Sequence, residues 1–304
     1  GVRAVTVLDA AAFARFAGPA APVPRPAGAV ATTTPPPPPG PAETQVAQGL
    51  QILPRSVLFK PLRADPRWPH FSATYQHWTD DRDVKEAGVA SFGETIPLVR
   101  DSGLGGQWEV GIQGGVFAVF DLAGESADLI NADYFVGLPL SYRQGNFSFM
   151  FRPYHQSSHL GDEYILRKGI TKAQRVNLSY EVLNAIASYD FGPSYRVYGG
   201  AGWLFDVDPG NLDRWMGQVG AEYRSTAVWW DAVRPVAALD MQFWQQHSWE
   251  PNLSLRAGVE LENVDILSRR IMIAGEYFHG HNPNGQFITR DLQFFGIGIH
   301  AFVD

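Results

Sequence analysis

Side chains that can do chemistry gather at one end of a single alternating segment, FSFMFRPYHQSSHL, which runs from Phe147 to Leu160. His155 and Ser157 are two residues apart there. Side chains two apart in a β-strand lie on the same face, so the imidazole and the hydroxyl would stand together. By the alternation this face is the apolar one, which in a membrane strand faces lipid.

Ligand-type side chains continue the segment, and with His155 they could form a metal or lipopolysaccharide-headgroup site: His159, Asp162 and Glu163. Their carboxylates would favour Ca²⁺, whereas their histidines would favour a transition metal. In a second interpretation, these side chains have no chemical role. A strand that leaves a membrane ends in polar side chains, and His, Ser and Gln are suited to the headgroup level.

The element that must position these residues is a strand with one apolar and one polar face. Phe147, Phe149 and Phe151 alternate with Ser148 and Arg152. The same alternation returns from His70 onward in about twelve segments of about ten residues, the length that a tilted membrane strand needs. Tyr and Trp recur near the segment ends. The pattern predicts an all-β fold, a transmembrane antiparallel β-barrel of about twelve strands.

The polar faces carry acids and bases in near balance. On a barrel they would line a narrow lumen and pair with one another. On a soluble β-sandwich, the alternative architecture, they would face water. The predicted lumen network comprises Arg152, Arg175, Glu181, Arg196, Glu222, Arg256 and Glu260.

Composition limits the remaining classes. The chain of 304 residues contains 18% charged and 13% aromatic residues, 31 glycines and no cysteine. No stretch approaches the roughly 18 apolar residues of a membrane helix, which excludes a helical membrane protein. The net charge of −7, with dispersed Lys and Arg, argues against nucleic-acid binding.

Three regions follow from these patterns. Residues 1–47 are rich in Ala and Pro and predict a disordered or extended periplasmic segment. Residues 48–69 contain four prolines and predict an ordered lead-in that packs on or in the body. Residues 70–304 predict the barrel. Short turns alternate with longer loops, as they do in outer-membrane proteins of Gram-negative-type bacteria. This predicts an outer-membrane location with the N-terminal segment of this chain in the periplasm.

Two stretches carry a resemblance to a known family. LFKPLRADPRWPHFSATYQ, from Leu58 to Gln76, together with YHQSSHLGDEY, from Tyr154 to Tyr164, resembles the bacterial family catalogued as domain of unknown function 1207. The resemblance covers about residues 50–304. It implies an envelope protein and a fold, but no activity.

The HQSS stretch is also similar to the His-x-Ser of outer-membrane phospholipase A and of the lipid A deacylases. That resemblance implies that Ser157 is a nucleophile and His155 its general base. A third residue should orient the histidine, and Asn177 is the nearest candidate. Its parity beside Leu178 and Tyr180 points it into the lumen, and the motif continues Ser-His where the relatives have Asn-Gly. Both departures argue against a hydrolase.

The sequence therefore favours a non-enzymatic barrel of structural, ligand-binding or narrow-pore role with a charge-filled lumen and no cofactor. An outer-leaflet lipid acyl hydrolase is one alternative, and a soluble β-sandwich binding module is another. The expected partners are outer-membrane lipid and lipopolysaccharide, the barrel-assembly machinery during biogenesis and a periplasmic partner for residues 1–69, with no nucleic acid.

Overall fold

The computed structural model describes residues 49–81, 83–124, 126–171 and 178–303, and in them one antiparallel sheet closes on itself. The strands are β2 (Phe71–Trp78), β3 (Glu86–Gly103), β4 (Gly106–Asp121), β5 (Asp128–Gly137), β6 (Leu140–Gln144), β7 (Phe147–Leu160), β8 (Ser179–Phe191), β9 (Tyr195–Asp208), β10 (Trp215–Arg224), β11 (Val233–Trp244), β12 (Pro251–Asp265), β13 (Arg269–His281) and β14 (Asp291–Val303).

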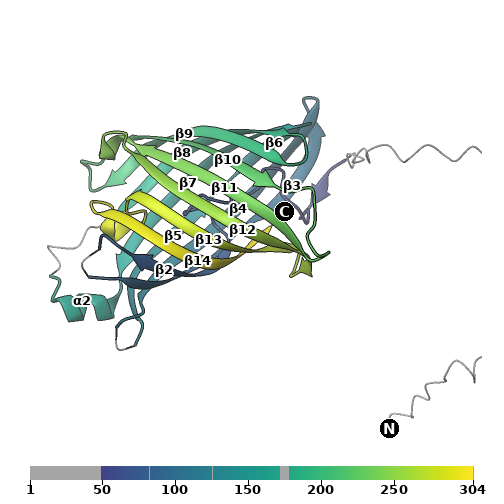
Figure 1. Cartoon of the computed structure of the whole chain (residues 1–304). Coiled ribbons are helices and arrows are strands. Elements are labelled where there is room, and N and C mark those ends of the chain that lie inside the picture. Colours follow the sequence, from purple (N-terminus) through teal and green to yellow (C-terminus); the bar gives the residue numbers. More distant parts are fainter. Residues whose placement is uncertain (1–48, 82, 125, 172–177, 304) are drawn as a thin grey trace, which may run out of the picture. The chain divides into compact units, whose positions relative to one another are not determined.

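Closure is made by the pairing of β14 with β2, from Phe294 opposite Trp78 to Ala301 opposite Phe71. β5 and β6 occupy one place in the wall, because both pair with β4 and with β7. The described chain thus forms a closed barrel of 12 strands (Figure 1). The predicted barrel is confirmed, and a single closed sheet replaces the two-sheet sandwich.

Side chains on the wall are apolar outside and polar inside. On β14 the large side chains of Phe295, Ile297 and Ile299 are exposed, while His300 is fully buried. A water-soluble sheet has the opposite arrangement, because its apolar face forms the core. The exposed apolar wall is therefore the surface that a membrane covers.

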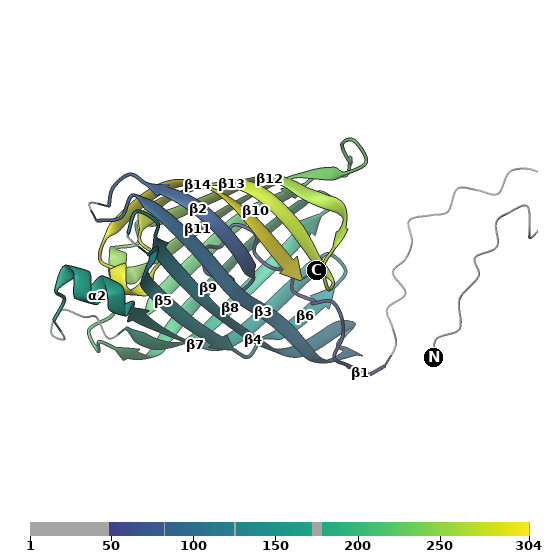
Figure 2. The same cartoon turned by 90° about the horizontal axis from the view of Figure 1, so that it is seen from below.

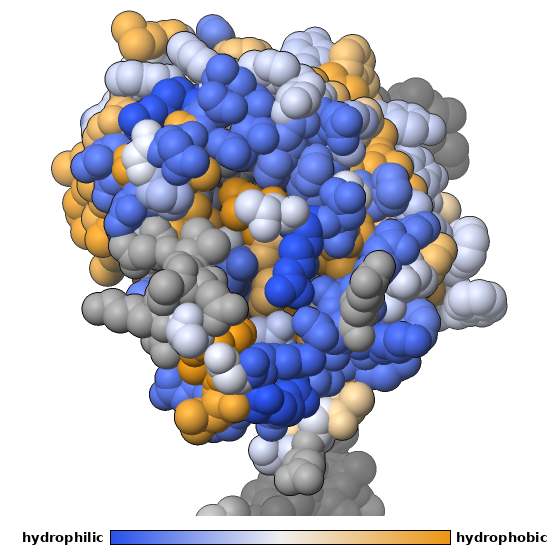
Figure 3. Space-filling model, turned by 90° about the vertical axis from the view of Figure 1, so that its left-hand side faces the viewer, coloured by the Kyte–Doolittle hydropathy of each residue, from blue (hydrophilic) through white to orange (hydrophobic). Residues whose placement is uncertain are grey.

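The two ends of the barrel differ. One end, here called the loop end, carries α2 (Asp162–Lys168) and the short helices η2 (Gln245–His247) and η3 (Gly285–Phe287) (Figure 1). Figure 3 views this end and shows mostly hydrophilic residues around small apolar areas. The opposite end, the turn end, carries short connections such as residues 145–146 and also β1 (Gln51–Ile52), which pairs with β3 (Figure 2). None of the described helices is long and apolar enough to span a membrane.

Residues 57–70, here called the inner segment, lie inside the barrel, because their partners come from strands on all sides. Leu58 N donates to Glu109 of β4, and Arg63 Nη1 contacts Glu260 of β12 at 2.8 Å. Arg67 pairs with Asp133 of β5. Leu62 and Trp68 are buried against Met150, Ile186 and Tyr198 of the wall. The inner segment consequently fills the middle of the lumen.

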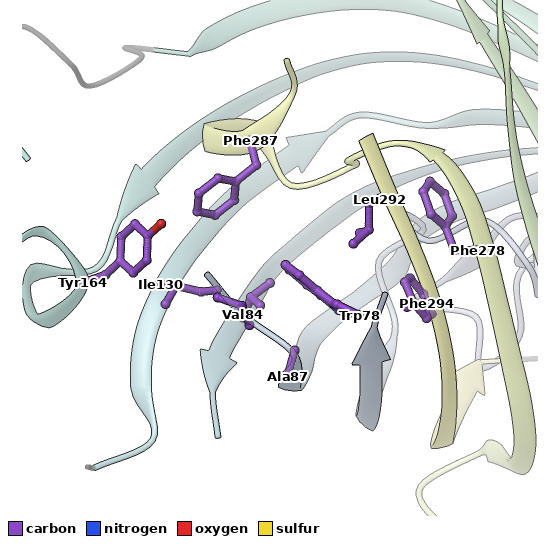
Figure 4. Packing of buried hydrophobic residues seen from close by; sticks show 10 residues of the cluster. Trp78, Val84, Ala87, Ile130, Tyr164, Phe278, Phe287, Leu292 and Phe294 are labelled. Atoms are coloured by element: carbon purple, nitrogen blue, oxygen red, sulfur yellow. The ribbon is translucent and has the colours of Figure 1, made fainter. Parts of the chain in front are cut away.

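An apolar cluster closes the loop end. Trp78 and Val84 pack with Ile130, Phe278 and Phe294, and Tyr164 of α2 meets the ring of Phe287 edge-on with centroids 5.9 Å apart (Figure 4). The connection that carries η3 also reaches the inner segment, since Arg67 Nη1 lies 3.5 Å from the side-chain oxygen of Asn284.

Five residues of the predicted lumen network face inward: Arg152, Arg196, Glu222, Arg256 and Glu260. Arg175 lies outside the described residues. Glu181 differs from the prediction, because it stands on the outer face of β8, 35% exposed. The inward set of that strand is Tyr180, Val182 and Asn184, which are buried.

Candidate active site

The outer face of β7 and β8 brings a histidine and a carboxylate together near the loop end. His155 and Glu181 are directly paired in the antiparallel register. His155 Nδ1 lies 2.8 Å from Glu181 Oε1. Because an ionised carboxylate only accepts, Nδ1 carries the hydrogen of this bond and Nε2 is the nitrogen left to accept another.

Ser157 follows on the same outward face, opposite Ser179 of β8. Within the described part of the chain, the Ser157 hydroxyl makes no hydrogen bond, and His155 makes none besides its contact with Glu181. The hydroxyl and Nε2 are therefore both available to a ligand. A serine, a histidine with Nε2 available and a carboxylate on the other ring nitrogen are the residue types of an acyl-transfer triad, and the structure joins two of them, His155 and Glu181, by a hydrogen bond.

The sequence pattern placed Glu181 on the lumen face, because the two faces of β8 were assigned from the residues near its loop end. Leu178, Tyr180 and Val182 suggest a lipid-facing set, but the structure buries them inside the loop end against Phe117, Phe135 and Tyr154. The residues at the other end of β8 indicate the correct face. Tyr189 is exposed on the outer face, and Glu181 lies eight residues before it, which places both on one face. Asn177, the predicted third residue, lies outside the described residues.

The site borders an apolar surrounding, although the exposed Asp206 of β9 is the register partner of Glu181. On β5, Tyr134 is paired with Ser157 and Val136 with His155, and both side chains are exposed. The Tyr134 ring meets His159 nearly edge-on, with centroids 5.6 Å apart. On the other side, Trp203 of β9 is paired with Leu183 of β8 and packs against Phe205 and Trp215. His155, Ser157 and Glu181 thus lie beside a wall that suits lipid chains.

The predicted metal ligands are not assembled. His159 is exposed at the end of β7, while Asp162 and Glu163 are exposed in the first turn of α2. Among the described residues, no group of three or more His, Asp or Glu side chains is placed to hold a metal ion.

A second histidine–carboxylate pair on the outer face shows which part of the site is distinctive. His77 Nδ1 of β2 lies 2.8 Å from Glu86 Oε1 of β3. The hydroxyl two residues after His77 belongs to Thr79, and it is within 3.3 Å of the Gln293 carbonyl oxygen and the Gln293 side chain. Glu86 is also bonded by Tyr75. Of these two pairs, it is the one at His155 that combines the histidine–carboxylate contact with a serine hydroxyl that has no described partner.

Comparison with known proteins agrees with the fold. The chain belongs to the family described as "Protein of unknown function (DUF1207)", whose model matches residues 1–302, and this confirms the resemblance seen in the sequence. Among curated proteins, none matches this chain.

Two solved structures share the architecture. The calcium-bound dimer of the outer membrane phospholipase of Salmonella typhi is 12% identical with a TM-score of 0.55, covering 77% of this chain and 90% of that one. Outer membrane phospholipase A from Escherichia coli is 13% identical with a TM-score of 0.53, covering 78% and 92%. At these identities the likeness concerns the fold, and the protein is an outer-membrane β-barrel.

Proposed function

We propose that this DUF1207 protein is a lipid acyl hydrolase of the outer leaflet, with Ser157 as nucleophile, His155 as general base and Glu181 as the group that orients the histidine. The observation that carries the proposal is the 2.8 Å contact from Glu181 to His155, two residues from Ser157, on a wall that faces lipid. The likeness to a barrel named as a phospholipase supports the proposal.

The proposed chemistry follows from the hydrogen-bond roles. Glu181 accepts from Nδ1–H and holds the tautomer in which Nε2 has a lone pair. Nε2 takes the Ser157 proton while the oxygen attacks the acyl carbonyl, and the imidazolium then protonates the leaving alcohol. Water hydrolyses the resulting acyl-serine by the reverse proton path, releasing a fatty acid.

The depth of the site suits an ester bond near the headgroups. A strand residue rises about 3.3 Å, so in a strand tilted by about 40° each residue climbs about 2.5 Å along the barrel axis. Ser157 is ten residues beyond Phe147, which begins the strand at the turn end, and therefore stands about 25 Å above it. The apolar band of such barrels is about 25 Å tall, so Ser157 is at its upper edge.

This assignment requires the loop end to face the outside, and it agrees with the predicted periplasmic location of residues 1–47. The expected partners are then outer-leaflet phospholipid or lipopolysaccharide, and the barrel-assembly machinery during insertion. A narrow-pore role is less well supported, because the inner segment and its ion pairs fill the lumen, whereas the predicted structural or ligand-binding role is the alternative proposal.

The test is fatty-acid release from phospholipid and from lipid A by the detergent-refolded protein, with and without Ca²⁺. Wild type should release fatty acid, and Ser157→Ala should abolish release while keeping the heat-modified gel mobility of a folded barrel. His77→Ala is the matched control, because it removes the histidine of the second pair, and it should retain activity. Silence of folded wild type on both lipids would refute the proposal, as would equal activity of Ser157→Ala.

A further inference from the structure

Basic side chains outnumber acidic ones inside the turn end. Lys60 and Arg143 share Asp190, with nitrogen–oxygen distances of 3.1 and 2.6 Å. Glu260 is shared by three arginines, whereas Glu222 has Arg196 at 3.4 Å. Because Arg270 has a further interaction, the basic residues of this group are Lys60, Arg63, Arg143, Arg196 and Arg224.

Among the described residues, three carboxylates pair with these five cations, while adjacent lumen pairs such as Arg100 with Glu109 and Arg256 with Glu276 are one to one. The excess of positive charge contrasts with the whole chain, whose net charge is −7. Like charges held close together inside a low-dielectric wall repel one another, so the group favours an additional anion.

A cavity of about 190 Å³ opens among these residues. Its lining joins Lys60 and Arg63 of the inner segment to Arg196 and Arg224 of the wall, and includes two of the carboxylates, Asp190 and Glu222. Because a water molecule takes about 30 Å³ in the liquid, the volume corresponds to roughly six waters. A tetrahedral oxyanion fits in that space.

Arg196 gives this cavity its most specific feature. The residue is 5% exposed, its Nε donates to Ser188 Oγ at 3.2 Å, and its Nη1 donates to the Pro61 carbonyl at 3.1 Å. Nη2 is buried and has no hydrogen-bond partner among the described residues. A guanidinium whose Nε and Nη1 are both held by the protein keeps Nη2 as a single donor for an anion oxygen. Leaving such a donor buried and unpaired is costly.

We infer that the turn-end cavity between the inner segment and β9–β10 is a binding site for a phosphate group, supplied either by a soluble phosphate or by a lipid headgroup. The site lies at the opposite end of the barrel from Ser157, so it is independent of the proposed hydrolysis. Its cations come from both the inner segment and the wall, and a bound phosphate would therefore bridge the two.

The experiment is a thermal-unfolding titration of the refolded full chain at constant ionic strength, with inorganic phosphate in one arm and short-chain phosphatidic acid in the other. Saturable stabilisation by inorganic phosphate would identify a soluble phosphate, and stabilisation by phosphatidic acid alone would identify a headgroup. Either result supports the site, whereas the absence of saturable stabilisation in both arms overturns it.

Variants test the location. Lys60→Gln with Arg224→Gln removes two cations without leaving a carboxylate unpaired, because Arg143 still meets Asp190, and Arg63 and Arg270 still meet Glu260. The double variant should bind phosphate on the order of tenfold more weakly. Lys168→Gln removes one cation at the loop end, where Lys168 meets Asp83, and should bind as wild type does. Equal weakening by Lys168→Gln would overturn the assignment, because it would show a general charge effect.

Discussion

His155 of β7 and Glu181 of β8 are register partners whose side chains meet at 2.8 Å on the outer face of the barrel. A cross-strand pair of this kind contributes only about 0.2–1 kcal/mol to the stability of a sheet. Stability is therefore a weak reason for a histidine–carboxylate contact on a lipid-facing wall, and orientation of the ring beside Ser157 is a stronger one.

Replacing Glu181 by Gln should lower the turnover number for fatty-acid release on the order of a hundredfold or more, because a neutral amide can hold the wrong tautomer and cannot stabilise the imidazolium. The denaturant midpoint should change little. Kinetics of release from phospholipid micelles, together with urea unfolding, would measure both quantities.

The matched substitution for that experiment is Glu86→Gln, which alters the second histidine–carboxylate pair in the same way. Its turnover should equal that of wild type. A similar loss in both variants would mean that the effect comes from the charge of the outer wall, and the triad role of Glu181 would fail.

The filled lumen predicts that the wild-type protein carries almost no ion current in planar bilayers. Arg63 and Arg67 tie the inner segment to Glu260 and Asp133 on different parts of the wall. The double variant Arg63→Ala, Arg67→Ala should show longer and larger openings, because it releases both ties. A large steady single-channel current from wild type would contradict this account of the lumen.

Two glycines of β10 offer a test of interior packing. A Cβ at Gly220 would lie 2.6 Å from the Leu239 carbonyl oxygen and would collide with the Tyr198 ring, whereas a Cβ at Gly217 meets nothing within 4 Å. Gly220→Ala should lower the free energy of unfolding by about 1–3 kcal/mol through overpacking. Gly217→Ala should leave it nearly unchanged, and urea titration of the two variants provides the comparison.

Acidification should weaken the loop end through His247. Burial, and then the neighbouring His281, lower the pKa of His247 to about 4, while Asp291 and Glu250 act in the opposite direction. The unfolded chain takes up this proton near pH 6.5 and the folded chain only near pH 4, so the free energy of unfolding falls as the pH drops between these values.

His247→Gln removes that titration and should flatten part of the decline in melting temperature between pH 6.5 and 4. Hydrogen exchange of residues 245–250 would localise the change. An unchanged pH profile in the variant would show that His247 does not contribute.

The sequence was sufficient for the wall of the barrel and insufficient for its contents. The alternation of Phe147, Phe149 and Phe151 with polar neighbours repeats locally, so the strands and their closure could be predicted. The face of β8 could not be judged from Leu178 to Val182, because the loop end contains a hydrophobic cluster inside the barrel, which inverts the usual rule for membrane strands.

The partners of the inner segment could not be predicted at all. Arg63 reaches Glu260 across 197 positions of the chain, and Asp65 accepts hydrogen bonds from Gln218 and Gln242. Contacts of such separation depend on the closed barrel, and no local pattern records them.

The inner segment leads directly into β2, the strand whose pairing with β14 closes the barrel. The charged residues of β5, β10 and β12 therefore pair with a segment near the start of the described chain. The seam, in contrast, is made by the last strand, β14. The interior is complete only when these long-range pairs have formed, so we expect closure of the seam and neutralisation of the lumen to be coupled during assembly.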